Sequence, residues 1–171
     1  GMLQLEEPSV LMDIGTNGEM VLCMGRKRGG ELYCASAAAG PALEGAGISC
    51  GVGGVPGAVC RVTPRPVMSY RTIGDQPAAG LCGCGLIDLV AALLTQGILE
   101  PNGNLREDYE LLGLHKDASG HVISVATGTG IELTQQDVRE LQLAKSALCA
   151  GLEALMSYAD VDAASLGRVY I

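Results

Sequence analysis

The residues best suited to chemistry lie in one short segment near the start of the chain, over residues 9–24. This segment reads SVLMDIGTNGEMVLCM, so an apolar run ends at Asp13 and a second apolar run begins at Met20. The dipeptide Asn17-Gly18 accepts the positive φ of a type I′ turn, so the spacing predicts two strands joined through these two residues. An ordinary hairpin without any chemistry would have the same pattern.

The residue types in this turn also suit the binding of a phosphate group. Gly15 and Gly18 leave the backbone bare, so several N–H groups could converge on an anion. Thr16 and Asn17 add short side-chain donors and acceptors. Asp13 would repel a bare phosphate, so it fits such a site when Mg²⁺ or a water lies between the two. The segment therefore predicts a phosphate clamp of strand–turn–strand type, distinct from a P-loop because Gly-Lys-Ser/Thr does not occur there.

A glycine-rich segment follows a predicted strand over 31–36. Residues 37–56 read AAAGPALEGAGISCGVGGVP, and Pro41 suits the first turn of a short helix that runs to about residue 46. Glu44 would then face either solvent or a cleft. The residues alone equally allow a plain connector with a buried alanine face.

Residues 83–96 predict a helix that ends at Gly97. Apolar residues recur there with the i, i+3, i+4, i+7 spacing of a helix face, namely Leu86, Leu89, Val90, Leu93 and Leu94. Gly83 and Gly85 lie in its first turn, where outward-pointing N–H groups form a second candidate anion site. Close packing of the helix on a strand through these glycines is the favoured alternative.

The remaining pattern predicts an α/β fold with a mixed sheet and packed helices. Strands are expected over 57–63, 67–73 and 122–126, with a final strand beginning at residue 166. The longest helix is expected over 134–158, where Thr134 is the N-cap and Asp137 follows it as in a capping box.

Composition narrows the function classes. The chain has 171 residues, which is enough for one domain with a real core, and without Phe or Trp that core must be aliphatic. A net charge of −8 makes nucleic acid and anionic membranes poor partners. The sequence has neither a signal-peptide pattern nor an apolar run long enough to span a bilayer, so a cytoplasmic location is expected.

Seven cysteines are expected to be reduced thiols. Cys82 and Cys84 form the one close pair, and the spacing is unlike a zinc or iron–sulfur set, so no metal site is expected among them. Gly1-Met2 is typical of the scar left when a tag is cleaved. The length of the chain predicts a single domain, which is expected over residues 3–171.

Four sequence blocks carry a resemblance. They are DIGTNGE from Asp13, AAGPALEGAGISCG from Ala38, GLCGCGLIDLV from Gly80 and LTQQDVRELQLAK from Leu133. In this order they resemble the C-terminal ATPase domain of the reductive activators of corrinoid proteins. That family is a branch of the acetate and sugar kinase/heat-shock cognate/actin superfamily. The blocks cover most of the chain, which makes the resemblance specific.

The resemblance implies one lobe of a ribonuclease H-like, actin-like ATPase fold that binds ATP and Mg²⁺. Asp13 would be the catalytic residue that orients Mg²⁺ or water, and the turn would bind phosphate. Five further residues would line the cleft, namely Glu44, Gly45, Gly47, Gly83 and Gly85. The domain would be the second half of the ATPase core, cut before its adenosine motif.

The same resemblance implies a partner and a wider function. The partner would be a corrinoid protein, and ATP hydrolysis would drive electron transfer to its cobalt. An iron–sulfur cluster would belong to a domain absent from this chain, and the chain by itself is expected to be inactive.

Other functions stay open. Val52-Gly53-Gly54 stands where these activators have Met-Arg-Ala, so any contact made by that Arg is in doubt here. One alternative is a non-catalytic module that forms a homodimer or docks a partner. Another is half of a related small-molecule kinase or dehydratase activator.

Overall fold

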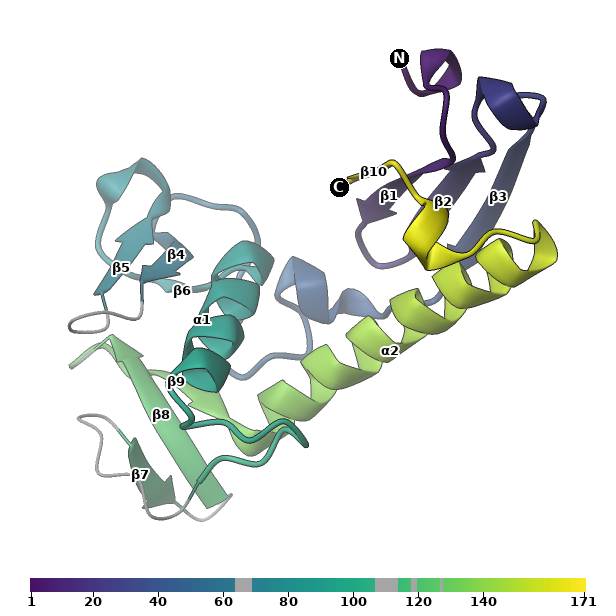
Figure 1. Ribbon diagram of the computed structural model, residues 1–171. Helices are drawn as coiled ribbons and strands as arrows, with labels where there is room; N and C mark the ends of the chain where they lie inside the picture. The colour runs from purple at the N-terminus through teal and green to yellow at the C-terminus, as the bar shows by residue number, and fades with distance from the viewer. Residues whose placement is uncertain (64–68, 107–113, 118–119, 127) are drawn as a thin grey trace. The chain divides into compact units, whose positions relative to one another are not determined.

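The computed structural model describes residues 1–63, 69–106, 114–117, 120–126 and 128–171 (Figure 1). Contacts within the chain separate two compact units. The first unit contains residues 1–40 and 144–171, and the second contains residues 41–143. The long helix α2 (Gln135–Tyr158) contributes its first nine residues to the second unit and the rest to the first.

The first unit is built on a four-stranded sheet in the order β10-β1-β2-β3. Its strands are β1 (Ser9–Ile14), β2 (Gly18–Cys23), β3 (Leu32–Ala37) and β10 (Arg168–Tyr170). The first three form an antiparallel meander, and β10 pairs in parallel with β1. Three short 3₁₀ turns complete the unit, namely η1 (Met2–Gln4), η2 (Arg26–Arg28) and η5 (Ala163–Ser165).

One face of this sheet is buried because α2 packs on it. Alternate side chains of a strand point to opposite faces, and Met20 and Leu22 on β2 are almost fully buried, as is their neighbour Val10 on β1. From the helix, Leu148 and Leu155 are also buried. The buried leucines in the second half of α2 thus lie on the face of the helix that covers the sheet.

The second unit contains two three-stranded sheets and one complete helix. The first sheet has the order β5-β4-β6, with β4 (Ala58–Thr63), β5 (Ser69–Thr72) and β6 (Gly80–Leu81). Helix α1 (Gly83–Thr95) packs on β4 and buries Leu86, Leu89 and Leu93. The short turns η3 (Pro41–Glu44) and η4 (Ile73–Asp75) also belong to this unit.

The second sheet has the order β7-β8-β9, with β7 (Leu114–Asp117), β8 (Gly120–Ala126) and β9 (Ile131–Thr134). Only the middle strand was predicted. The outer strands are four residues long, which is too short for a clear alternation signal in a polar, turn-rich sequence. The predicted start of the strand at 67 lies outside the described residues.

The mixed α/β architecture agrees with the prediction, as do the two long predicted helices to within two residues. The short helix predicted from Pro41 is a 3₁₀ turn that ends at Glu44. The buried apolar core consists of aliphatic side chains, methionines and cysteines. Among the described residues, no helix combines the length and the apolar content needed to cross a bilayer.

Candidate functional site

The candidate phosphate hairpin consists of β1, β2 and a three-residue connection. Ile14 pairs with Gly18 across the two strands, so only residues 15–17 lie in the turn. Neither Asn17 nor Gly18 has a positive φ, so the predicted type I′ turn at Asn17-Gly18 is wrong. The N–H of Gly15 instead donates to the Asn17 carbonyl oxygen at 2.9 Å. The turn is one residue longer than predicted and begins at Gly15.

Gly18 is the first residue of β2, and its missing side chain makes room for α2. A Cβ placed on Gly18 would lie 2.0 Å from Cδ2 of Leu148, well inside van der Waals contact. Both residues are buried. A side chain at this position would have to displace the end of the Leu148 side chain, so the packing favours glycine as the first residue of β2. Gly18 therefore has a packing role in the structure.

Asp13 lies on the exposed face of the hairpin, directly opposite Glu19 in register. Opposed side chains of an antiparallel pair have Cβ atoms about 4.5–5.5 Å apart, and like charges in that position destabilise the pair. A divalent cation would relieve this repulsion. In the part of the chain that the structure describes, no hydrogen bond or ion pair involves the Asp13 carboxylate.

The hairpin residues fit a Mg²⁺-bound phosphate. Carboxylate oxygens are the ligands that Mg²⁺ prefers, and two carboxylates stand together at the end of the hairpin. Thr16 and Asn17 are exposed in the turn. The Gly15 N–H already has an acceptor within the turn, so the set of backbone donors is smaller than predicted.

The glycine-rich loop (residues 45–54) follows η3, which begins at Pro41 as predicted. Glu44 is exposed, whereas Gly45 is buried and a Cβ on it would lie 2.4 Å from the Val52 carbonyl oxygen. Gly47 is exposed with φ +78°, and no atom lies within 4 Å of the place where its Cβ would be. Gly47 thus presents bare backbone to the surroundings, while Gly45 packs inside.

Gly83 and Gly85 pack the start of α1 against other backbone segments. A Cβ on Gly83 would lie 1.8 Å from the Leu43 carbonyl oxygen, and a Cβ on Gly85 would lie 2.1 Å from the Val59 carbonyl oxygen. Both glycines are buried. The geometry supports close packing, the favoured alternative, and brings the start of α1 against η3. The cleft role of these two residues stays a prediction.

Asp137 joins the start of α2 to the glycine-rich loop, which the sequence did not predict. Its carboxylate is 1% exposed. One oxygen accepts hydrogen bonds from the N–H and Oγ of Ser49 at 2.8 and 3.0 Å. The other accepts from the N–H and Oγ1 of Thr134 at 2.8 and 2.9 Å. The capping box was readable from the sequence, but the contact with Ser49 spans 88 positions and was not.

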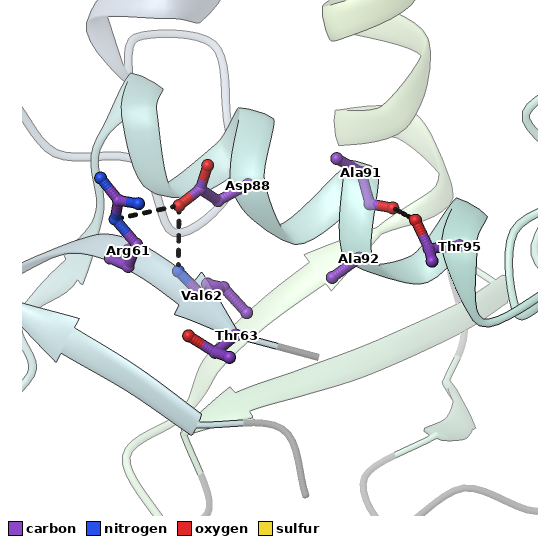
Figure 2. Close-up of a pocket in the computed structure, with 7 residues that line it drawn as sticks. All are labelled: Arg61, Val62, Thr63, Asp88, Ala91, Ala92 and Thr95. Atoms are coloured by element: carbon purple, nitrogen blue, oxygen red, sulfur yellow. Dashed lines mark hydrogen bonds and ion pairs between the residues drawn. The ribbon is translucent and has the colours of Figure 1, made fainter. Parts of the chain in front are cut away.

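Asp88 in α1 lies at the edge of a shallow groove between the helix and β4. Figure 2 shows its carboxylate directed at β4, where it accepts a hydrogen bond from the Val62 N–H at 3.3 Å and pairs with Arg61 at 3.6 Å. The groove has a volume of about 280 Å³, which is slightly below the usual range of about 300–1,000 Å³ for ligand pockets. Asp88 therefore serves chiefly to bind the end of β4 that extends beyond its pairing with β6.

The seven cysteines are all free thiols. Cys82 is buried and donates to the Val59 carbonyl oxygen, whereas Cys84 is exposed, so this pair does not converge on one point. Burial, and then the negative charge of Asp137, raises the pKa of the Cys50 thiol to about 11. Within the described ranges, no group of three or more His, Cys, Asp or Glu side chains could hold a metal ion.

Comparisons with known proteins agree with the resemblance seen in the sequence. Residues 7–171 match the family described as the C-terminal domain of RACo, the ASKHA domain. The chain is 31% identical to the corrinoid activation enzyme RamQ of Eubacterium limosum, over 100% of this chain and 30% of RamQ. It is 33% identical to the Co(II) methylated amine-specific corrinoid protein reductase of Methanosarcina barkeri, over 91% of this chain and 31% of that protein.

A solved structure of a corrinoid activator has a similar fold. The reductive activator for corrinoid, iron–sulfur protein matches 99% of this chain with a TM-score of 0.86 and 32% sequence identity. The match takes in 28% of that activator. The chain thus spans less than a third of the length of each of these relatives.

Proposed function

The chain belongs to the family of C-terminal ASKHA domains that includes that of RACo, and we propose that it serves the ATP-dependent reductive activation of a corrinoid protein. The family has the actin-like fold, which the mixed α/β architecture and the structural match both support. The observation that carries the proposal is the similarity of almost the whole chain to three corrinoid activators.

In this proposal the hairpin of the first unit is the phosphate site. Asp13 orients Mg²⁺ or the attacking water, and the backbone of residues 16–18 binds phosphate, since the Gly15 N–H already donates to the Asn17 carbonyl oxygen. Bound MgATP supplies the free energy of phosphoryl transfer to water, a reaction that depends mainly on positioning and electrostatics. The exposed, unpartnered carboxylate of Asp13 opposite Glu19 supports this role within the described part of the chain.

In the second unit, the candidate ligand contacts are Glu44, Gly45, Gly47, Gly83 and Gly85. Gly47 is the strongest of them, because its backbone is exposed and uncovered. Each of the other glycines lies against backbone atoms of another segment, so less of its backbone is open to a ligand.

The electron transfer requires a redox cofactor. We propose that one electron passes from an iron–sulfur cluster to the cobalt of the partner corrinoid protein, and that the cluster belongs to a domain outside residues 1–171. The free thiols of this chain fit a reducing compartment, which supports a cytoplasmic location.

The direct test is a calorimetric titration of MgATP and MgADP into this chain, beside Asp13→Asn, Glu19→Gln and Glu153→Gln. We expect wild-type binding that Asp13→Asn weakens about tenfold or more, because a charged ligand of the cation is lost. Glu19→Gln should weaken it less. Glu153→Gln is the matched control, since it removes an exposed carboxylate of α2 in the same unit.

A non-catalytic docking or dimerisation module is the second candidate. The observation that favours it is that Gly18, Gly83 and Gly85 all lie against side-chain or backbone atoms, as glycines used only for packing would. Absence of heat and of a thermal shift with either nucleotide, together with a stable homodimer in sedimentation, would favour this module over a nucleotide site.

A further inference from the structure

We propose that Asp137 is a positioning residue that holds the glycine-rich loop in a ligand-ready conformation. The inference rests on the proposed function, in which Gly47 of this loop is a candidate ligand contact of the second unit. It adds a residue of α2 that does not itself touch the ligand. The evidence is the burial of the carboxylate and the four hydrogen bonds that it accepts.

Residues 50–52 of the loop are attached by backbone hydrogen bonds and by close backbone packing, all within the second unit. The Val52 N–H donates to the Leu81 carbonyl oxygen at 3.0 Å, and the Leu81 N–H donates to the Cys50 carbonyl oxygen at 2.8 Å. Gly45 and Gly51 are so close that a Cβ on Gly51 would lie 1.8 Å from the Gly45 carbonyl oxygen. In the middle of the loop, the N–H and the hydroxyl of Ser49 donate hydrogen bonds to Asp137.

Ser49 is one of the attachment points of the segment that contains the exposed Ala46 and Gly47. The Ala46 N–H also donates to the Pro41 carbonyl oxygen at 3.1 Å, and the Ile48 side chain is buried. Both exposed residues precede Ser49 by two or three positions, and Gly47 has a left-handed backbone that glycine adopts without strain. Two of the bonds to Asp137 come from this one residue, from its N–H and from its hydroxyl. Release of Ser49 would remove the attachment on the C-terminal side of Gly47 that depends on α2.

A carboxylate is the required group because four donors converge on it. Two of the donors are backbone N–H groups, of Ser49 and Thr134, which can only donate. Asparagine has nearly the same shape, but its NH₂ group would face one of these N–H groups. That would leave a buried donor without an acceptor, which is costly. Asp137→Asn thus removes the acceptor of either Ser49 or Thr134 and weakens the link between them, without creating a cavity.

The test uses this chain as wild type, Asp137→Asn, Ser49→Ala and the control Arg139→Ala. Arg139 also lies in the first turns of α2 and donates hydrogen bonds within the second unit, but to residues 102–104 rather than to the glycine-rich loop. Two quantities are measured, namely amide hydrogen exchange over residues 45–52 and the Kd for MgATP. A denaturation curve for each variant reports the loss of stability.

We expect Asp137→Asn to speed exchange of the Ser49 amide about tenfold or more and to raise the Kd by a similar factor. Ser49→Ala, which removes only the hydroxyl donor, should show smaller changes of the same sign and serves if Asp137→Asn does not fold. Arg139→Ala should lower stability without changing either quantity. A variant that raises the Kd more than its loss of stability would explain indicates a positioning role. A variant that lowers stability without raising the Kd indicates a structural role alone.

Two results would overturn the inference, and they differ from failure of the proposed function. If wild type binds MgATP and Asp137→Asn binds it equally well, Asp137 does not position a ligand-binding loop, whereas the proposed function stands. If Asp137→Asn and Arg139→Ala weaken binding equally, the effect is one of stability alone. If wild type binds no nucleotide, the nucleotide function of this chain fails, and the positioning role fails with it.

Discussion

At the scale of single residues, the glycines of the candidate site differ in whether neighbouring atoms or open space lie where a Cβ would be. Gly18 and Gly83 leave out a Cβ because Leu148 and the Leu43 carbonyl oxygen occupy its place. Gly47 has open space around it and a left-handed backbone instead. The glycines of the candidate site are therefore of two kinds, and only the second kind has exposed backbone with open space beside it.

Cys50 gives a prediction at this scale. Its pKa of about 11 keeps the thiol protonated at neutral pH, and the thiolate is the form that reacts with iodoacetamide. At pH 8 its thiolate fraction should be about a hundredfold below that of a thiol with the ordinary pKa of 9.0. Peptide mapping by mass spectrometry should therefore find Cys50 alkylated much more slowly than the exposed Cys34 and Cys84.

The same shift affects stability at high pH. The folded chain holds the Cys50 proton more tightly than the unfolded chain does. The stability that this contributes is complete below about pH 9 and is lost as the pH rises toward 11. Alkylation of Cys50 at pH 8 as fast as that of Cys34 would contradict both the raised pKa and the burial.

At the scale of elements, α2 has two different halves. Its first turns are polar and bind loops of the second unit through Gln135, Asp137, Arg139 and Gln142. Its later turns are apolar and cover the sheet of the first unit. A single amphipathic pattern does not describe such a helix, because one part is positioned by hydrogen bonds and the other by hydrophobic burial.

Arg139 gives the prediction at this scale. Its guanidinium donates to the Asn102 carbonyl oxygen at 2.9 Å, to Gln142 Oε1 at 2.7 Å and to Asn104 Oδ1. Arg139→Ala should lower the free energy of unfolding by about 1 kcal/mol, because the site is half-exposed and part of the gain is screened. Urea denaturation measures this change.

Lys145 provides the matched control for Arg139, since it is an exposed cation further along the same helix. Lys145→Ala should change the free energy of unfolding by no more than about 0.5 kcal/mol. Equal effects of the two substitutions would mean that the hydrogen bonds to residues 102–104 do not stabilise the second unit.

At the scale of the whole molecule, the chain is acidic, with a net charge of −8. Such a protein repels free ATP, so a nucleotide site must depend on local donors and on a cation that neutralises the phosphates. The paired carboxylates of Asp13 and Glu19 increase this dependence, because they add negative charge at the hairpin itself.

Removal of Mg²⁺ gives the prediction at this scale. With EDTA and at constant ionic strength, ATP should bind about tenfold or more weakly than MgATP, because phosphates and carboxylates then face one another without a cation. Asp13→Asn should weaken the binding of MgATP, but it should not weaken the binding of free ATP in the presence of EDTA. Calorimetry in the two buffers measures both. Equal affinity of wild type for ATP with and without Mg²⁺ would exclude a cation at Asp13.

The sequence by itself determined the family, the α/β class and both helices of this chain. These depend on local signals, namely four motif blocks in order, the helical spacing of leucines in α1 and the capping pair Thr134 and Asp137. The strands of the meander were also predictable, because each has alternating or continuous apolar residues bounded by glycine and polar turns.

Only the tertiary structure decided how the glycines and carboxylates are used. The turn at Gly15 is three residues long because Ile14 pairs with Gly18. Gly18 lies beneath Leu148, and this contact joins residues 130 positions apart. Asp137 binds Ser49 across 88 positions, and Asp88 binds the end of β4 across 26. Local sequence encodes the propensity of each segment, but it does not encode which distant atoms will fill the space beside a glycine or donate to a buried carboxylate.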